Sequence, residues 1–158
     1  MILAGVEYEF PIYRQVSSCP QILDEAVGGN VDGLTPGELL EKALPIALAH
    51  FSKVEERAAG QFYHLEHTGL ASSDFPTILK EASVGRVQSL FVAVGVQVWG
   101  TYTPGERELV ILDGQTPEAE DLLNLAAMYT FMNSGDVYAV QPDRVPGGGG
   151  HLAATFRY

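Results

Sequence analysis

Leu90-Phe91-Val92-Ala93-Val94 is an unbroken run of apolar residues, and three of its five side chains are aromatic or β-branched. A short run without polar alternation is typical of a strand that is covered on both faces. Strands of this kind occur where helices pack on either side of a sheet, so the run predicts an α/β fold. Four further apolar runs are predicted as strands of the same sheet: residues 2–5, 108–112, 137–140 and 152–156.

A long helix is predicted between the first two strands. Thr35-Pro36-Gly37-Glu38 has the pattern of a capping box, with proline at the first helical position. Apolar residues then recur at three- and four-residue steps, which indicates one buried face of a helix that runs to about His67. This face consists of Leu40, Ala43, Leu44, Ala47, Leu48, Phe51, Val54, Ala58, Phe62 and Leu65. Pro45 should bend the helix or mark a restart.

Three shorter helices are predicted from local signals. The first lies within residues 6–16, where Pro11 makes it short, kinked or late to start. The second begins at the cap Ser73-Asp74 and stops at Gly85. The third begins at Thr116-Pro117, with the acids that follow placed to favour its dipole. Its buried stripe is Leu122, Leu125, Ala126, Tyr129 and Met132, and Gly135 closes it.

Length and charge narrow the class of protein. A chain of 158 residues predicts a single domain with an independent core. The net charge of −11 and the absence of adjacent basic residues argue against nucleic-acid binding, which depends on lysine and arginine neutralising phosphates. No apolar stretch is long enough to span a membrane, and no basic segment precedes the first apolar residues as in a signal peptide. The single cysteine fits a reducing cytoplasm.

No catalytic or metal-binding constellation emerges from the residues. His64 and His67 are predicted as exposed helix residues rather than metal ligands, and Cys19 as a half-buried structural thiol, because nothing nearby would lower its pKa. The serines form no nucleophile elbow. Residues 147–150 are four glycines that could present amides to an anion, but the Lys and Ser or Thr of a phosphate loop do not follow, so a tight turn is favoured.

Three stretches together resemble a known family: Ile2-Leu3-Ala4-Gly5, Gly85-Arg86-Val87-Gln88-Ser89-Leu90-Phe91-Val92, and the glycines 147–150 through Phe156-Arg157-Tyr158. In this order they resemble the third, C-terminal domain of archaeo-eukaryotic peptide-chain release factors and of Pelota, and above all their bacterial homologues. Residues 121–127 followed by 135–139 add to the resemblance.

The resemblance implies a three-layer α/β/α sandwich with a mixed sheet, like that of kink-turn-binding ribosomal proteins. It also implies that residues 1–158 are the C-terminal domain of a longer protein. The glycine-glycine-glutamine loop that hydrolyses the ester in these release factors belongs to their middle domain and is missing here. Its nearest matches, Ala59-Gly60-Gln61 and Asp113-Gly114-Gln115, are explained by helix and turn.

We therefore expect a non-catalytic protein-interaction domain that docks a translational GTPase or another translation partner and reaches the ribosome through the full-length protein. We expect no cofactor, no metal, no membrane and no direct nucleic-acid binding. The predicted docking residues are Trp99, Tyr102, Gly147, Gly148, Gly149, Gly150 and Tyr158, which combine uncovered backbone with aromatic anchors. Two alternatives stay open. In one, Trp99 simply caps the core while the glycines form a turn; in the other, the chain is instead a stand-alone RNA-binding or small enzymatic domain.

Overall fold

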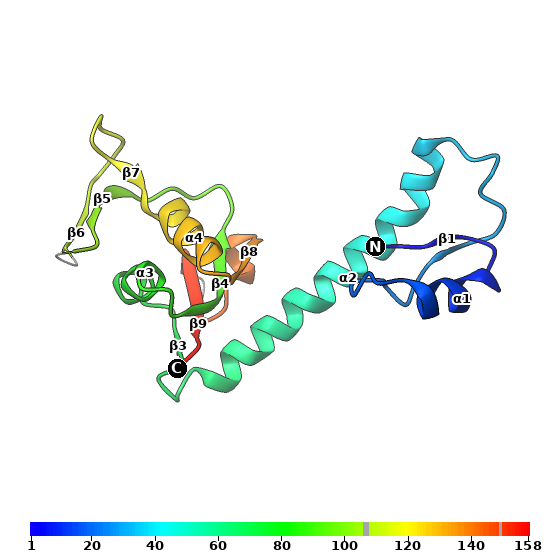
Figure 1. The fold of residues 1–158 in the computed structure, drawn as a ribbon. Coiled ribbons are helices and arrows are strands. Elements are labelled where there is room, and N and C mark those ends of the chain that lie inside the picture. Colours follow the sequence, from blue (N-terminus) through cyan, green and yellow to red (C-terminus); the bar gives the residue numbers. More distant parts are fainter. Residues whose placement is uncertain (106–107, 149) are drawn as a thin grey trace. The chain divides into compact units, whose positions relative to one another are not determined.

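A computed structural model describes residues 1–105, 108–148 and 150–158 of the chain (Figure 1). The chain divides into two compact units, Met1–Glu55 and Glu56–Tyr158. The helix α2 (Pro36–Leu65) contributes its first part to the first unit and its last turns to the second. Each unit has its own sheet and is described by itself.

The first unit begins with a short β-α-β segment. It consists of β1 (Ala4–Gly5), α1 (Glu9–Val16) and β2 (Val27–Gly28), and the two strands pair in parallel. Pro11 is the third residue of α1, where its missing amide costs nothing, so the helix starts late as its proline predicts. Val27 is the only buried residue among those described in this unit.

The start of α2 confirms the predicted capping box. The Thr35 amide donates to Glu38 Oε2 at 2.8 Å, and the Glu38 amide lies 3.4 Å from Thr35 Oγ1. The Thr35 amide and the Thr35 hydroxyl both donate to Glu38 Oε2, and these two hydrogen bonds hold the pKa of Glu38 below its ordinary value. The helix continues through Pro45 without a restart and ends at Leu65, where the Thr68 hydroxyl donates to the Leu65 carbonyl.

The predicted buried face of α2 is wrong for the first part of the helix. Leu40, Leu44, Leu48 and Phe51 are 47–66% exposed. Ala58 and Phe62, in the last turns, are buried as predicted. The periodicity identifies the apolar face correctly, but burial also needs a layer that covers it. The last turns have such a layer within the second unit.

The second unit is built on a mixed sheet of four strands in the order β3-β9-β4-β8. These strands are β3 (Ala71–Ser72), β4 (Val87–Ala93), β8 (Asp136–Val140) and β9 (Leu152–Phe156). The central strand β4 contains the decisive apolar run, and it pairs in parallel with β8 and antiparallel with β9. The strands predicted over residues 90–94, 137–140 and 152–156 are therefore confirmed.

Both faces of this sheet are covered. On one face Leu90, Leu152 and Ala154 pack against the helices α3 (Phe75–Ser83) and α4 (Leu122–Met132). On the other face Phe91 and Ala153 pack against Ala58 and Phe62 of α2. The result is the three-layer arrangement of helices and mixed sheet that the sequence predicts.

Two predicted strands lie outside this sheet, which corrects the prediction. Leu3 directly precedes β1, which pairs only with β2 among the described strands. Residues 109–111 belong to β6 (Glu108–Ile111), in a second antiparallel sheet with β5 (Trp99–Thr103) and β7 (Glu120–Asp121). A hairpin forms here because β6 pairs with the strand nearest to it in sequence, and Gly100 allows the Val110 carbonyl to approach: a Cβ atom there would lie 2.2 Å away.

The cap of α3 is confirmed, but the start of α4 differs from its prediction. The Asp74 side chain accepts from the Thr77 amide at 3.0 Å, and Gly85 has the positive φ of a helix stop. By contrast, Thr116 closes a turn with Ala119, and α4 begins only after its cap Asp121. Residues 120–121 pair with β5 instead of joining the helix. Met132, predicted in the buried stripe, is 72% exposed because the helix ends there.

Candidate docking surface

The predicted docking residues lie at three places in the second unit. Trp99 and Tyr102 are in β5, the glycines precede β9, and Tyr158 follows β9. Gly149 lies outside the described residues.

The two aromatic residues of β5 differ in exposure. Trp99 is half-buried and pairs with Asp121 of β7. Tyr102 is 7% exposed, and its hydroxyl lies 3.0 Å from Ser83 Oγ at the end of α3. Burial also raises the pKa of the neighbouring Tyr129, with Glu120 and Tyr102 adding to the effect. Of this pair, only Trp99 is therefore accessible to a partner.

The first two glycines of the run lie in a turn, where Gly147 is packed and Gly148 is open. Gly147 has a φ of +82°, and a Cβ atom there would lie 3.0 Å from Ser73 Cβ and 3.1 Å from Phe62 Cζ. Gly148 has a φ of +99°, with no atom within 4 Å of its Cβ position. The turn therefore needs glycine for its backbone, and it also exposes backbone at Gly148.

Tyr158 lies at the other end of β9 from the glycines. Leu152 pairs with Val92 and Phe156 with Val87, so β9 runs the whole length of β4. Five strand residues span roughly 17 Å. The Arg86 guanidinium lies 5.1 Å from the Tyr158 ring centre and also bonds the Tyr158 carbonyl. The structure therefore does not bring Tyr158 and the glycine run together.

Trp99 and the glycine run lie at the same edge of the main sheet. The amide of Ala93, the last residue of β4, donates to the His151 carbonyl just after the glycines. Val98, next to Trp99, accepts from Leu122, the first residue of α4. Because α4 leads into β8, which is parallel to β4, its first residue lies at the carboxyl edge of these strands. This edge carries the accessible part of the predicted surface.

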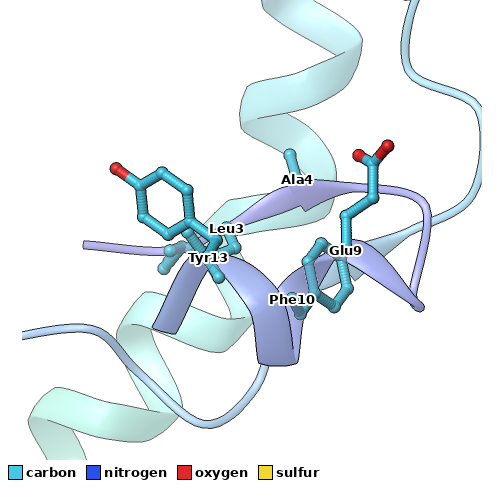
Figure 2. Close-up of a pocket in the computed structure, with 6 residues that line it drawn as sticks. Leu3, Ala4, Glu9, Phe10 and Tyr13 are labelled. Atoms are coloured by element: carbon cyan, nitrogen blue, oxygen red, sulfur yellow. The ribbon is translucent and has the colours of Figure 1, made fainter. Parts of the chain in front are cut away.

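The first unit contains two pockets that the sequence analysis missed. One has a volume of about 300 Å³ and lies between β1 and α1 (Figure 2). Figure 2 shows Phe10, Tyr13 and Leu3 around it, with the Glu9 carboxylate as its charged group. The other, of about 310 Å³, lies at the carboxyl ends of the two parallel strands and is lined by Ala4, Gly5, Val6, Glu9, Gly29, Asn30, Val31 and Asp32. The sequence signal for these pockets is a pair of glycine-ended strands joined by a helix, because ligands often bind at the carboxyl ends of parallel strands.

The other residues considered in the sequence have the predicted exposure. His64 and His67 are exposed, and Cys19 is a half-buried free thiol. Within the described residues, no group of three or more histidine, cysteine or acidic side chains could hold a metal ion. No helix in the described parts of the chain is long and apolar enough to cross a membrane.

Comparisons with known proteins give a family and a fold. A sequence profile of bacterial archaeo-eukaryotic release factor family 3 matches residues 1–86. No curated protein sequence matches the chain. The C-terminal domain of a peptide chain release factor from Methanosarcina mazei is similar in structure, with a TM-score of 0.53 and 13% identity over 80% of this chain and 97% of that one.

A second similar chain comes from a model of ribosome-bound archaeal Pelota and ABCE1. Its TM-score is 0.44 and its identity 16%, over 96% of this chain and 40% of that one.

Proposed function

Because the chain belongs to family 3 of the bacterial archaeo-eukaryotic release factors, we propose that it docks a translational GTPase or another translation partner as the C-terminal domain of a longer, ribosome-associated protein. The observation that carries this proposal is the family match over residues 1–86, together with the release-factor fold over most of the chain. Its one free cysteine fits an action in the reducing cytoplasm.

The proposed docking surface is the carboxyl edge of the main sheet, with Trp99 and the open turn at Gly148 as its centre. A half-buried tryptophan can add contact area without unfolding the domain, and tryptophan is the residue most enriched at interface hot spots. Gly148, in the turn at the same sheet edge, leaves its backbone without side-chain cover, with no atom within 4 Å of its Cβ position. Tyr158 lies at the opposite edge of the main sheet, so any contact it makes with the same partner would be separate from this surface.

The proposed role is non-catalytic. The glycine-glycine-glutamine tripeptide is absent from the sequence, Gly60 lies within α2, and Gly114 is in a bend after β6. Acid–base and oxyanion catalysis require groups that converge within hydrogen-bond distance of one reacting atom. Glu9 and Asp32, which line the polar pocket, are both acidic and offer no such set by themselves.

The test is co-elution of the chain with each purified translational GTPase of the bacterium that encodes it, in the presence of a non-hydrolysable GTP analogue. We expect one of these GTPases to co-elute with the wild-type chain. Trp99→Ala and Gly148→Asp should each abolish this co-elution. Tyr63→Ala is the matched control, because Tyr63 is an exposed aromatic residue on α2. Co-elution with none of the GTPases would contradict the proposal, and unchanged co-elution of both variants would place the interface elsewhere.

A further inference from the structure

The helix α4 has no charged residue over its eleven positions, although one side of it faces solvent. Its sequence is LLNLAAMYTFM, and its inward side is buried in the core of the second unit. On its outward side Met128, Phe131 and Met132 are 45%, 75% and 72% exposed. A helix that is apolar all round is normally buried on all sides. Apart from the exposed Asn124, the outward side of α4 therefore has the composition of a covered surface.

Val84 extends this apolar surface beyond the helix. It follows α3, is 51% exposed, and lies next to Gly85. A Cβ atom on Gly85 would be 2.9 Å from Asn133 Oδ1, so the ends of α3 and α4 lie side by side. We call Val84, Met128, Phe131 and Met132 the α4 patch. Large exposed apolar side chains that gather in this way mark interaction sites.

The two ends of α4 differ in the sign of the charges near them. Glu118 and Glu120 are exposed just before the helix, and Asp121 caps it. At the other end the Arg157 guanidinium donates to the Asn133 carbonyl at 2.6 Å while the residue stays exposed. Arg86, also at this end, is paired with Glu81 at 2.7 Å. The acidic end thus lacks a cation, whereas Arg157 at the other end belongs to no ion pair within the described residues.

From this arrangement we propose that the α4 patch is a homodimer interface, in which two copies of the chain pack their α4 helices antiparallel about a twofold axis. An isologous contact requires a surface that is complementary to itself. Antiparallel packing places Arg157 of one copy beside Glu118 and Glu120 of the other, twice in the dimer. It also places the apolar side chains of both copies against each other.

The absence of charge in the α4 patch favours contact between two copies there. The net charge of −11 makes two copies repel each other over most of their surfaces. The α4 patch is free of charge, so contact there avoids this repulsion, and the exposed apolar face of α2 that carries Phe51 is the alternative contact that the control variant tests. Four side chains per copy bury less than the roughly 800 Å² per partner of a standard interface. The dimer is therefore weak, with a dissociation constant on the order of 10–100 µM.

The test is sedimentation equilibrium of the chain from about 10 to 500 µM, a range that brackets this affinity. The average mass should rise from 17.0 kDa toward twice that value. Phe131→Asp should weaken association at least about tenfold, because a carboxylate would be buried in the apolar contact. Phe51→Asp is the matched control, since Phe51 is 66% exposed on α2. A chain that stays monomeric, or a dimer lost with Phe51→Asp but kept with Phe131→Asp, would overturn the proposal.

A charge exchange tests the antiparallel arrangement separately. Glu120→Arg and Arg157→Glu should each weaken the dimer, because each places like charges opposite one another. The double variant should restore association to within about threefold of the wild type, because it places opposite charges together again. Melting curves confirm that each variant is folded. Additive weakening in the double variant would contradict the antiparallel packing.

Discussion

Phe62 lies against Gly147: Phe62 Cζ is 3.1 Å from the position that a Cβ atom of Gly147 would occupy. Phe62 is 1% exposed and belongs to the core between α2 and the main sheet. The contact therefore ties the last turns of α2 to the turn that begins the proposed docking surface. The first glycine of the run holds the turn in place, and the second is the one open to a partner.

This difference predicts unequal effects of alanine at the two glycines. Gly148→Ala should cost about 1–2 kcal/mol, because its positive φ is strained for a residue with a Cβ atom but its surroundings are open. Gly147→Ala should cost about 3 kcal/mol, since crowding against Phe62 and Ser73 adds to the same strain. Urea denaturation of both variants measures the difference. Equal losses of stability would show that the packing of Gly147 is unimportant.

Phe62 itself should be essential for the second unit. Phe62→Ala removes a buried ring from the core beside Phe91 and Ala153, which should cost about 3–5 kcal/mol. Tyr63→Ala, one position along the same helix, should change stability by less than about 0.5 kcal/mol because its side chain is exposed. Thermal melting of the two variants compares the effects. A similar drop in both would mean that α2 does not pack on the sheet through Phe62.

The capping box at the start of α2 predicts a pH dependence. Hydrogen bonds from Thr35 lower the pKa of Glu38 in the folded chain. A lowered folded pKa stabilises the fold at pH values above the ordinary glutamate pKa, and this contribution is lost as the pH falls through the lowered value. Thr35→Ala removes the hydrogen bond from the Thr35 hydroxyl but keeps the larger effect of the Thr35 amide, so it should raise the pKa of Glu38 only part of the way toward its ordinary value. An NMR titration of the Glu38 side chain measures it, and an unchanged pKa in the variant would contradict the cap.

The acidity of the chain predicts that it does not bind RNA. With twenty acidic and nine basic residues, contact with phosphates adds repulsion where counterion release should favour binding. Filter binding to structured RNAs at about 150 mM salt should give no sub-micromolar affinity, as expected without a basic patch. Tight binding with a steep salt dependence would refute this and would favour the alternative of an RNA-binding domain.

The sequence predicts the main sheet and its helices well because these elements have strong local signals. The apolar run of β4, the capping box at Thr35 and the cap at Asp74 each specify their element without help from distant residues. The strands β2, β3 and β7 are not predicted, because they have only two residues each, too few for any periodicity to show.

Tertiary pairing explains the other differences. Thr116-Pro117 has the signals of a helix start, yet β7 pairs with Trp99 and Gly100, and α4 begins after that pairing. The residue type of Tyr102 predicts a surface anchor, but the side chain is buried in the core with residues of α3 and α4, and its hydroxyl lies 3.0 Å from Ser83 Oγ. Both outcomes depend on contacts that no local pattern contains.

The most direct test of the proposed function is the affinity of the chain for a translational GTPase, measured by isothermal titration calorimetry with a non-hydrolysable GTP analogue. We predict saturable binding at one site, weakened at least about tenfold by Trp99→Ala, as expected for a tryptophan hot spot, and unchanged by Tyr63→Ala. Failure of the chain to bind any translational GTPase of its bacterium would contradict the proposed function.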